Sequence, residues 1–443
     1  MIGDMKNKQP IRGFSKLSRN EKLKLITERL GSSAGFEQSM NDHLHTNHSL
    51  QSKYFEFSEN TLSNYYLPYG VAPNFLINGK DYILPMVTEE SSVVAAASAA
   101  AGFWFSNGGF HTRIIGTEKA GQVHFVWKGT PEKLRDFFLK KKRILIKELD
   151  PITGKMRKRG GGITRIDLLD KTQEIDDYYQ LDVGFETLDA MGANFINSCL
   201  EKLAITFENE IIAYPDFSAI EKEVEIIMAI LSNYTPGCRV EVLTECPINA
   251  FSEIDKTLSA LDFVRRFELA VRVAQMDTSR AVTHNKGIFN GIDAVTLATG
   301  NDFRAVEACG HAFASREGQY KGLTRVEIHN NTFRYILDIP MAMGTVGGLT
   351  RLHPLAVQSL ELLGNPSAEM LMKIAAAAGL ANNFSAIRSL VTGGIQKGHM
   401  KMHLNNILNH FKATDEEKEK AGNHFQDRKI SFHEVEQFLN KIR

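Results

Sequence analysis

The segment 280–308 constrains the fold and the chemistry of this chain more than any other part of its sequence. It reads RAVTHNKGIFNGIDAVTLATGNDFRAVEA, so Lys286 stands between a polar His284-Asn285 pair and a glycine, and Asp302 precedes an alanine-rich stretch. A lysine and an aspartate carried by turns on either side of a buried element can share one cleft. There the lysine would stabilise a developing oxyanion and the carboxylate would adjust its charge. The simpler alternative is a solvated loop followed by a helix capped at its N-terminus.

The composition indicates a globular protein of more than one domain. The 443 residues exceed one hydrophobic core, and 43% hydrophobic and 23% charged residues are ordinary for such a protein. The 52 basic and 52 acidic residues balance, so bulk charge gives no support for a nucleic-acid or membrane partner.

The remaining signals of location favour the cytoplasm. No uninterrupted apolar run reaches the roughly 20 residues that span a bilayer, and the first residues lack the apolar core of a signal peptide. The four cysteines have no CxxC spacing, so we expect free, reduced thiols.

The order of predicted elements indicates an α+β protein. Between residues 109 and 220 the pattern reads strand, helix, strand, strand, helix, which is of ferredoxin-like type. The flanking sequence is helix-rich. We therefore predict a large domain formed by 1–108 and 221–385, a small domain at 109–220 inserted into it, and a helical C-terminal flap at 386–443.

A nicotinamide nucleotide would need a device other than the Rossmann loop, because no GxGxxG follows a predicted strand and no Walker A sequence is present. The run DAMGAN at 189–194 offers one. Gly192 permits close backbone approach, and a helix that begins near Ala193 would direct its N–H groups at a pyrophosphate. Asp189 and Asn194 can hydrogen-bond ribose or carboxamide. A glycine turn that caps a packing helix explains the same residues.

Four segments, in this order, resemble the bacterial, soluble class (class II) of hydroxymethylglutaryl-CoA reductase. They are PMVTEESSVVAAAS at 85–98, DAMGAN, THNKG followed by ATGND, and GIQKGHM at 394–400. The resemblance runs from about Phe14 to about Met400. It implies an enzyme that interconverts 3-hydroxy-3-methylglutaryl-CoA and mevalonate plus CoA by two successive hydride transfers with NAD(P)H. It also implies that the small domain binds the dinucleotide, and that the protein is a homodimer or larger homo-oligomer with its sites at the subunit interface.

The resemblance assigns four catalytic residues. Lys286 would stabilise the oxyanion, and Glu90, the second of two adjacent glutamates, would supply a proton. Asp302 would keep Lys286 charged. His399, next to Gly398 on the flap, would protonate the departing CoA thiolate.

The binding residues that the resemblance implies fall into two groups. The dinucleotide group is Asp189, Met191, Gly192 and Asn194. The substrate group is Ser92, Arg280, Thr283, Asn290 and Asn383. Arg280 would pair with the substrate carboxylate in a bidentate manner, although an internal acid is an equally suitable partner, and both asparagines also suit turns or caps. The basic run at 140–147 favours NADPH, whereas Asp150 keeps NADH open.

No metal site is expected, because His399 and His403 lack a third ligand nearby. Two other functions remain open. One is a different NAD(P)-linked hydroxy-acid dehydrogenase that does not depend on CoA. The other is a non-catalytic CoA-binding protein on the same fold.

Overall fold

The computed structural model describes residues 10–30, 34–255, 257–393, 404–405, 407–425, 428 and 430–443, and internal contacts divide the chain into residues 1–68 and 69–443. The first unit is helical among its described residues. The Ser18 N–H donates to Glu21 Oε2 (2.7 Å) and the Glu21 N–H donates to Ser18 Oγ (3.3 Å), which is a capping box at the start of the first α-helix. The elements of this unit are η2 (Phe14–Lys16), α1 (Arg19–Leu30), α2 (Ala34–Asp42) and α3 (His48–Glu56).

The second unit begins with the hairpin β1 (Tyr69–Ile77) and β2 (Lys80–Val87). Its turn residues Asn78 and Gly79 have φ of 47° and 80°, as a tight two-residue hairpin turn requires. The hairpin leads into α4 (Val93–Phe105), which buries alanines along with Trp104. The Asn78-Gly79 dipeptide and the alanine-rich run at 95–101 are the sequence signals that predict these two elements.

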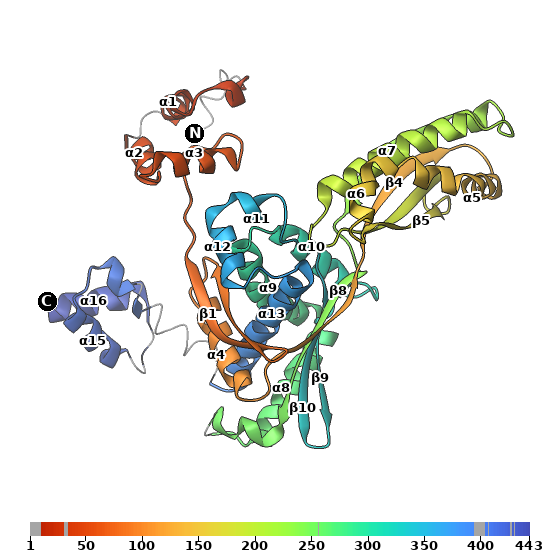
Figure 1. Cartoon of the computed structure of the whole chain (residues 1–443). Helices are drawn as coiled ribbons and strands as arrows, with labels where there is room; N and C mark the ends of the chain where they lie inside the picture. The colour runs from red at the N-terminus through yellow and green to blue at the C-terminus, as the bar shows by residue number, and fades with distance from the viewer. Residues whose placement is uncertain are drawn as a thin grey trace. The chain divides into compact units, whose positions relative to one another are not determined.

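A four-stranded antiparallel sheet with the order β3-β8-β10-β9 forms the framework of the large domain. Long helices, α13 above all, cover one face of it and share one hydrophobic core with it (Figure 1). Its strands are β3 (His111–Thr117), β8 (Cys238–Pro247), β9 (Thr324–His329) and β10 (Thr332–Pro340). Its other elements are η4 (Ile248–Glu253), α8 (Ala260–Met276), α9 (Thr278–Ala298), α10 (Phe303–Ala314), α11 (Leu349–Leu352), α12 (Pro354–Leu362) and α13 (Ala368–Val391).

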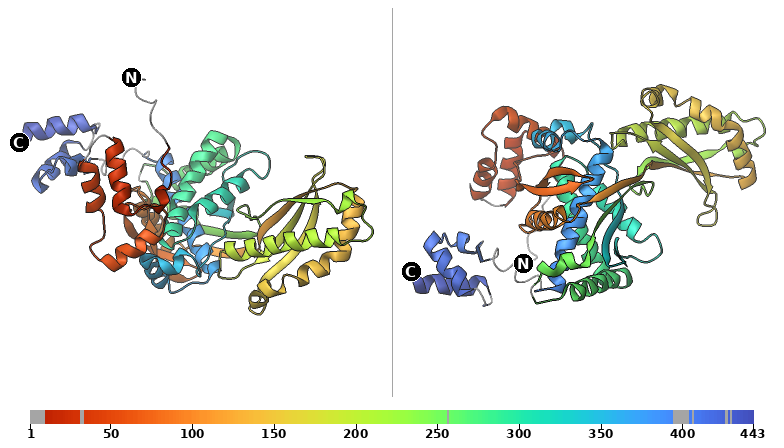
Figure 2. Two further views of the ribbon diagram at one scale, coloured as in Figure 1. Left: turned by 90° about the horizontal axis from the view of Figure 1, so that it is seen from above. Right: turned by 60° about the horizontal axis from the view of Figure 1, so that its bottom comes forward.

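The small domain is a second antiparallel sheet with the order β5-β6-β4-β7 and a core of its own. Every second residue of β4 is buried, so one face of the sheet carries the core, and helices cover that face (Figure 2). With α5 and α6 counted as one helical connection, the chain order is βαββαβ, and the strand order is that of a ferredoxin-like fold. The elements are β4 (Lys119–Trp127), α5 (Pro131–Lys147), α6 (Asp150–Arg157), β5 (Gly162–Asp170), β6 (Tyr178–Glu186), α7 (Ala193–Ile212), η3 (Ile220–Lys222) and β7 (Val224–Ser232).

The α+β class is confirmed, but strand pairing moves the predicted boundary of the small domain. β3 pairs with β8 of the large sheet, so the small domain starts near Lys119 and not at residue 109. β7 pairs with β4, so the domain continues to about Ser232 and not to residue 220. The predictions erred because strands of both sheets have the same alternating pattern. The break at residue 386 is also wrong, since it falls inside α13.

Among the described residues, α13 is the one helix long and apolar enough to cross a membrane by length and composition alone. Yet 83% of its apolar window is buried inside the fold. It packs against α9, α4 and the large sheet, and this burial explains its composition.

The described residues after 403 form a separate helical cluster with its own small apolar core. Its helices are α15 (Asp415–His424) and α16 (Phe432–Ile442), and the first is preceded by a capping box between Thr414 and Glu417. The helical character predicted for this end of the chain is confirmed for these residues.

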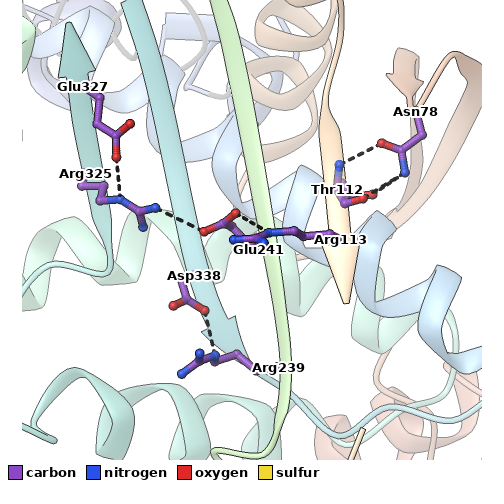
Figure 3. A network of polar contacts seen from close by, with 8 residues as sticks. All are labelled: Asn78, Thr112, Arg113, Arg239, Glu241, Arg325, Glu327 and Asp338. Atoms are coloured by element: carbon purple, nitrogen blue, oxygen red, sulfur yellow. Dashed lines mark hydrogen bonds and ion pairs between the residues drawn. The ribbon is translucent and has the colours of Figure 1, made fainter. Parts of the chain in front are cut away.

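A polar network ties β3 to the sheet just before the chain leaves for the small domain (Figure 3). Glu241 on β8 accepts from Arg113 on β3 (2.8 Å) and from Arg325 on β9 (3.2 Å). Burial acts to raise the pKa of Glu241, but the two arginines outweigh it and hold that pKa below its ordinary value. The Asn78 side chain joins the hairpin to Thr112 of β3 in the same way, accepting at 2.8 Å and donating at 2.9 Å.

Candidate active site

A carboxylate and an ammonium group form the centre of the site. Glu90 Oε2 lies 2.8 Å from Lys286 Nζ, and Ser92 Oγ donates to the other carboxylate oxygen of Glu90 at 3.0 Å. Glu90 and Ser92 lie in the turn before α4, and the Glu90 N–H donates to Thr88 Oγ1 at 3.2 Å. This turn therefore holds one carboxylate facing the lysine.

Lys286 lies in the middle of a helix and not in a turn. α9 begins after Asp277, whose side chain accepts from the Arg280 N–H, and continues without a break to Ala298. Both interpretations of the sequence that placed Lys286 in a turn or solvated loop are wrong. Helical spacing puts Thr283, Lys286 and Asn290 on one face of α9.

Two glycines allow α9 to approach α13 closely. A Cβ on Gly291 would lie 2.2 Å from the carbonyl oxygen of Ala378, and a Cβ on Gly287 would lie 3.3 Å from Asn383 Nδ2. Gly291 is therefore required for this helix packing, and Gly287, directly after Lys286, eases it. The close approach brings polar side chains of α13 to the level of Lys286.

The two helices and the Glu90 turn enclose a cavity of about 530 Å³. Seven predicted site residues line it: Glu90, Ser92, Arg280, Thr283, Lys286, Asn290 and Asn383. Its wall combines several hydrogen-bond donors with one carboxylate. Such a lining suits a ligand that carries anionic and carbonyl oxygens.

A buried hydrogen-bond chain fixes the Asn383 amide at the wall of this cavity. Asn383 Nδ2 donates to the carbonyl oxygen of His284 (2.7 Å), so its Oδ1 must be the acceptor of the Tyr335 hydroxyl. Because that hydroxyl has one proton, Thr324 must donate to Tyr335 and accept from His284 Nε2. Burial lowers the pKa of His284 to about 3, so its ring is neutral and carries its proton on Nε2.

Asp302 does not meet Lys286 within one chain. It caps α10, accepts from the backbone N–H groups of Arg304 (3.0 Å) and Ala305 (3.2 Å), and forms a bidentate pair with the Arg304 guanidinium. Burial would raise the pKa of Asp302, but these bonds hold it below its ordinary value. From Lys286 to the end of α9 the rise is about 18 Å. Gly310 packs against Phe289, so α10 runs back along α9 and leaves Asp302 at the far end.

The DAMGAN turn starts α7 as predicted. Gly192 has φ of 96°, and a Cβ there would lie 2.5 Å from Thr187 Cγ2, so glycine is required. Among the described residues no side chain caps α7, so the first N–H groups of this 20-residue helix are available to an anion. Asn194 is exposed next to them. These features fit the diphosphate of a dinucleotide.

Asp189 and Met191 contact the large domain. Asp189 Oδ1 accepts from the Ala368 N–H at 2.8 Å, at the start of α13. Gly344 lies against the Met191 backbone, and its N–H donates to Asn301 Oδ1 at 2.8 Å. The DAMGAN turn therefore lies on the Asp302 side of the large domain, away from the Glu90–Lys286 pair.

Some predicted features lie outside these two regions. His399 and Gly398 fall outside the described residues. Within the part of the chain that the structure describes, no group of His, Cys, Asp or Glu side chains could hold a metal ion.

The four cysteines are free and buried, and burial raises the pKa of Cys199 to about 12, so it is not a nucleophile at neutral pH.

The cavity also has lining residues that the sequence analysis did not single out. Asn382, Ser385 and Arg388 of α13 all face it. They recur at helical spacing on an otherwise apolar helix, and that period is the signal that would have identified them.

Comparison with known proteins agrees with this architecture. A family model described as hydroxymethylglutaryl-coenzyme A reductase matches residues 18–404. The 3-hydroxy-3-methylglutaryl-coenzyme A reductase of Archaeoglobus fulgidus is 36% identical over 436 residues, which cover 98% of this chain and 94% of that protein.

Solved structures give the same result. A 3-hydroxy-3-methylglutaryl-coenzyme A reductase from Streptococcus pneumoniae is 33% identical with a TM-score of 0.72, over 98% of this chain and 100% of that chain. A class II enzyme from the same organism, bound to NADPH in open conformations, is 34% identical with a TM-score of 0.70, over 87% of this chain and 100% of that one.

The relative and the solved structures named above are all reductases of 3-hydroxy-3-methylglutaryl-coenzyme A. The chain belongs to the hydroxymethylglutaryl-coenzyme A reductase family.

Proposed function

We propose that the protein interconverts 3-hydroxy-3-methylglutaryl-CoA and mevalonate plus CoA, with NADPH as the preferred reductant, in the cytoplasm. The observation that carries the proposal is the Glu90–Lys286 pair, 2.8 Å apart at the wall of a cavity that also holds Arg280. The pair supplies a proton donor and a cation for a carbonyl oxygen, and the arginine supplies a partner for a carboxylate.

Lys286 and Glu90 act on the same oxygen. Each reduction converts a carbonyl carbon to a tetrahedral one and places negative charge on its oxygen, and the Lys286 ammonium stabilises that charge. For this step Glu90 takes up a proton from solvent once the substrate oxygen replaces its carboxylate beside Lys286, and it then delivers that proton to the oxygen. Ser92, which donates to the second oxygen of Glu90, orients the carboxyl group for this transfer.

The other lining residues position the substrate. Arg280 takes the carboxylate at the end of the acyl chain opposite the thioester. Thr283, Asn290 and Asn383 offer hydroxyl and amide groups to the remaining oxygens, and the buried chain from His284 keeps the Asn383 amide from rotating. In the thioester step, His399 protonates the leaving thiolate.

Two NADPH molecules, bound one after the other at the DAMGAN turn, would each supply one hydride. The α7 N-terminus would hold its diphosphate, Asp189 and Asn194 its ribose or carboxamide, and Gly192 allows the backbone to approach. The bound nicotinamide in a relative from Streptococcus pneumoniae is NADPH, which supports that choice over NADH.

One site takes its residues from two protomers. Asp302 and the DAMGAN turn lie at the far end of α9 from Lys286, about 18 Å along the helix, so a single chain cannot bring them together. A homodimer in which each protomer presents Asp302 and DAMGAN to its partner's Glu90–Lys286 pair completes the constellation. In that arrangement the partner's aspartate supports the lysine charge.

The competing functions differ in what they require of the cavity. A dehydrogenase of free hydroxy acids needs no thiolate acid and would turn over without CoA. A non-catalytic CoA-binding protein would not need Lys286 and Glu90 in contact. Their short ion pair therefore favours the reductase.

The test is a spectrophotometric assay of NADPH oxidation with 3-hydroxy-3-methylglutaryl-CoA, with released CoA quantified by a thiol reagent. The expected result is two NADPH oxidised for each CoA released, because the thioester and then the aldehyde are reduced. One NADPH per CoA, or no turnover with NADPH or NADH, would contradict the proposal. Faster turnover with NADH would change only the cofactor.

A further inference from the structure

Two arginines line the substrate cavity from opposite helices. Arg280 belongs to α9 and Arg388 to α13, and both are partly buried. Burial lowers the pKa of each guanidinium, yet arginine remains charged at any physiological pH. Within the described ranges, neither guanidinium has a hydrogen bond or an ion pair to an acid. The Arg280 backbone is engaged in the helix cap, but its side chain is left to the cavity.

The packing of the helices brings the two arginines to the same end of the cavity. Gly291 of α9 lies against Ala378 of α13, and Gly287, one turn earlier, lies against Asn383 and Ala386. Lower numbers on α9 thus meet higher numbers on α13, so the helices are antiparallel. Arg280 lies two turns before Gly287 on α9. It is therefore level with the last turn of α13, beyond Ala386 and near Arg388.

The charges around the cavity do not balance. Among the described residues that line the cavity, Glu90 and Lys286 neutralise each other, which leaves two positive guanidinium groups with no acid beside them. A charge that is partly removed from water without a partner is unfavourable, so a ligand anion is the natural partner. The chain that follows α13 cannot supply one, because residues 394–403 contain neither Asp nor Glu.

We propose that Arg388 is a specificity-determining residue, which with Arg280 clamps the terminal carboxylate of the acyl chain between α9 and α13. The clamp makes the cavity selective for acyl thioesters that carry a second carboxylate. The inference rests on the proposed function, and it assigns to Arg388 a role that the sequence analysis gave to Arg280 alone.

The experiment compares Arg388→Gln with Arg272→Gln, a control at an exposed arginine of α8. Each enzyme is assayed with 3-hydroxy-3-methylglutaryl-CoA and with 3-hydroxy-3-methylbutyryl-CoA, which differs in lacking the carboxylate. Loss of a charge-assisted bond should lower kcat/KM for the first substrate about tenfold to a hundredfold, mainly through KM. For the second substrate kcat/KM should change less than about twofold. Arg388→Lys should recover part of the loss.

An equal fall with both substrates would overturn the proposal, because Arg388 would then support the fold or bind the CoA moiety. No change with either substrate would overturn it as well. Thermal unfolding distinguishes a role of Arg388 in supporting the fold from a role in binding the substrate. Removing an unpaired guanidinium should leave the midpoint of Arg388→Gln at or above that of the control, and a marked fall would contradict the clamp.

A binding measurement keeps this test independent of turnover. Calorimetry with free 3-hydroxy-3-methylglutarate should show binding to the unmodified protein and to Arg272→Gln, and weaker binding to Arg388→Gln. Equal affinities in all three would overturn the clamp. Absence of turnover in the unmodified enzyme, with this binding pattern intact, would instead count against the proposed reaction.

Discussion

Lys286 keeps 61% of its side chain exposed, and Glu90 keeps 34%. An ion pair this open to water adds little to stability, on the order of 0–1 kcal/mol. Its value is therefore chemical, since it holds a donor and a cation at one point of the cavity wall. The residues of this pair were predictable because their sequence context is specific. Their contact was not, because it joins positions 196 residues apart.

Glu241, in contrast to the Glu90–Lys286 pair, contributes to the stability of the fold. It is 8% exposed and bonded to two arginines. Its pKa in the fold is below its ordinary value of 4.5, so its contribution is present above that value and is lost as the pH falls through the folded pKa.

Glu241→Gln should lower the free energy of unfolding by about 1–3 kcal/mol at pH 7, because the charge-assisted bonds from both arginines are lost. The gap to the unmodified protein should close as the pH falls through the lowered folded pKa of Glu241, because the carboxyl group is then protonated. Denaturant titrations at several pH values measure it. Glu245→Gln on the same strand is the control, because its pair with Arg334 is exposed and should be worth less than about 1 kcal/mol. Equal losses in the two variants would show that the Glu241 network is not special.

At the scale of elements, the cavity depends on how closely α9 and α13 approach each other. The glycines that permit this contact are the same letters that suggested a turn around Lys286. A glycine in a helix and a glycine in a turn look alike in one sequence, and only the partner helix distinguishes them. The β1–β2 hairpin, α4 and α7 were predictable because their sequence signals are local. These signals are a turn dipeptide, an alanine-rich run and a glycine just before the helix. The α9–α13 contact is not local, so it was missed.

Gly291→Ala should destabilise the protein by about 1–3 kcal/mol or more, because its Cβ would lie 2.2 Å from the Ala378 carbonyl oxygen and force the helices apart. Thermal unfolding measures the effect. Gly154→Ala in α6 is the matched control: a Cβ there has nothing within 4 Å, so this variant should gain up to about 1 kcal/mol. Equal unfolding midpoints in the two variants would contradict this prediction, because they would show that α9 and α13 accommodate the added methyl group.

At the scale of the whole molecule, the sequence predicted an inserted small domain but misplaced its edges. Strands β3 and β8 are neighbours in the large sheet, and the small domain occupies the chain between them. Which sheet a strand joins depends on pairing across more than a hundred residues, and alternation of apolar residues does not carry that information. The prediction that Asp302 contacts Lys286 within one chain was wrong for a related reason. The two residues are close in the sequence, but the straight path of α9 separates them in space.

In the proposed dimer each reductase site combines Lys286 of one protomer with Asp302 of its partner. Mixed dimers test it most directly. Lys286→Ala and Asp302→Asn are produced with different affinity tags, alone and together, and the doubly tagged heterodimer is purified and assayed with 3-hydroxy-3-methylglutaryl-CoA and NADPH. Each variant alone should lose about a hundredfold or more of its rate, because an oxyanion partner or its support is missing.

In the heterodimer both substitutions fall in one site and the other site is intact, so about half of the unmodified activity should return. A heterodimer as inactive as its parents would contradict the claim, because it would show that Lys286 and Asp302 serve the same site from the same chain.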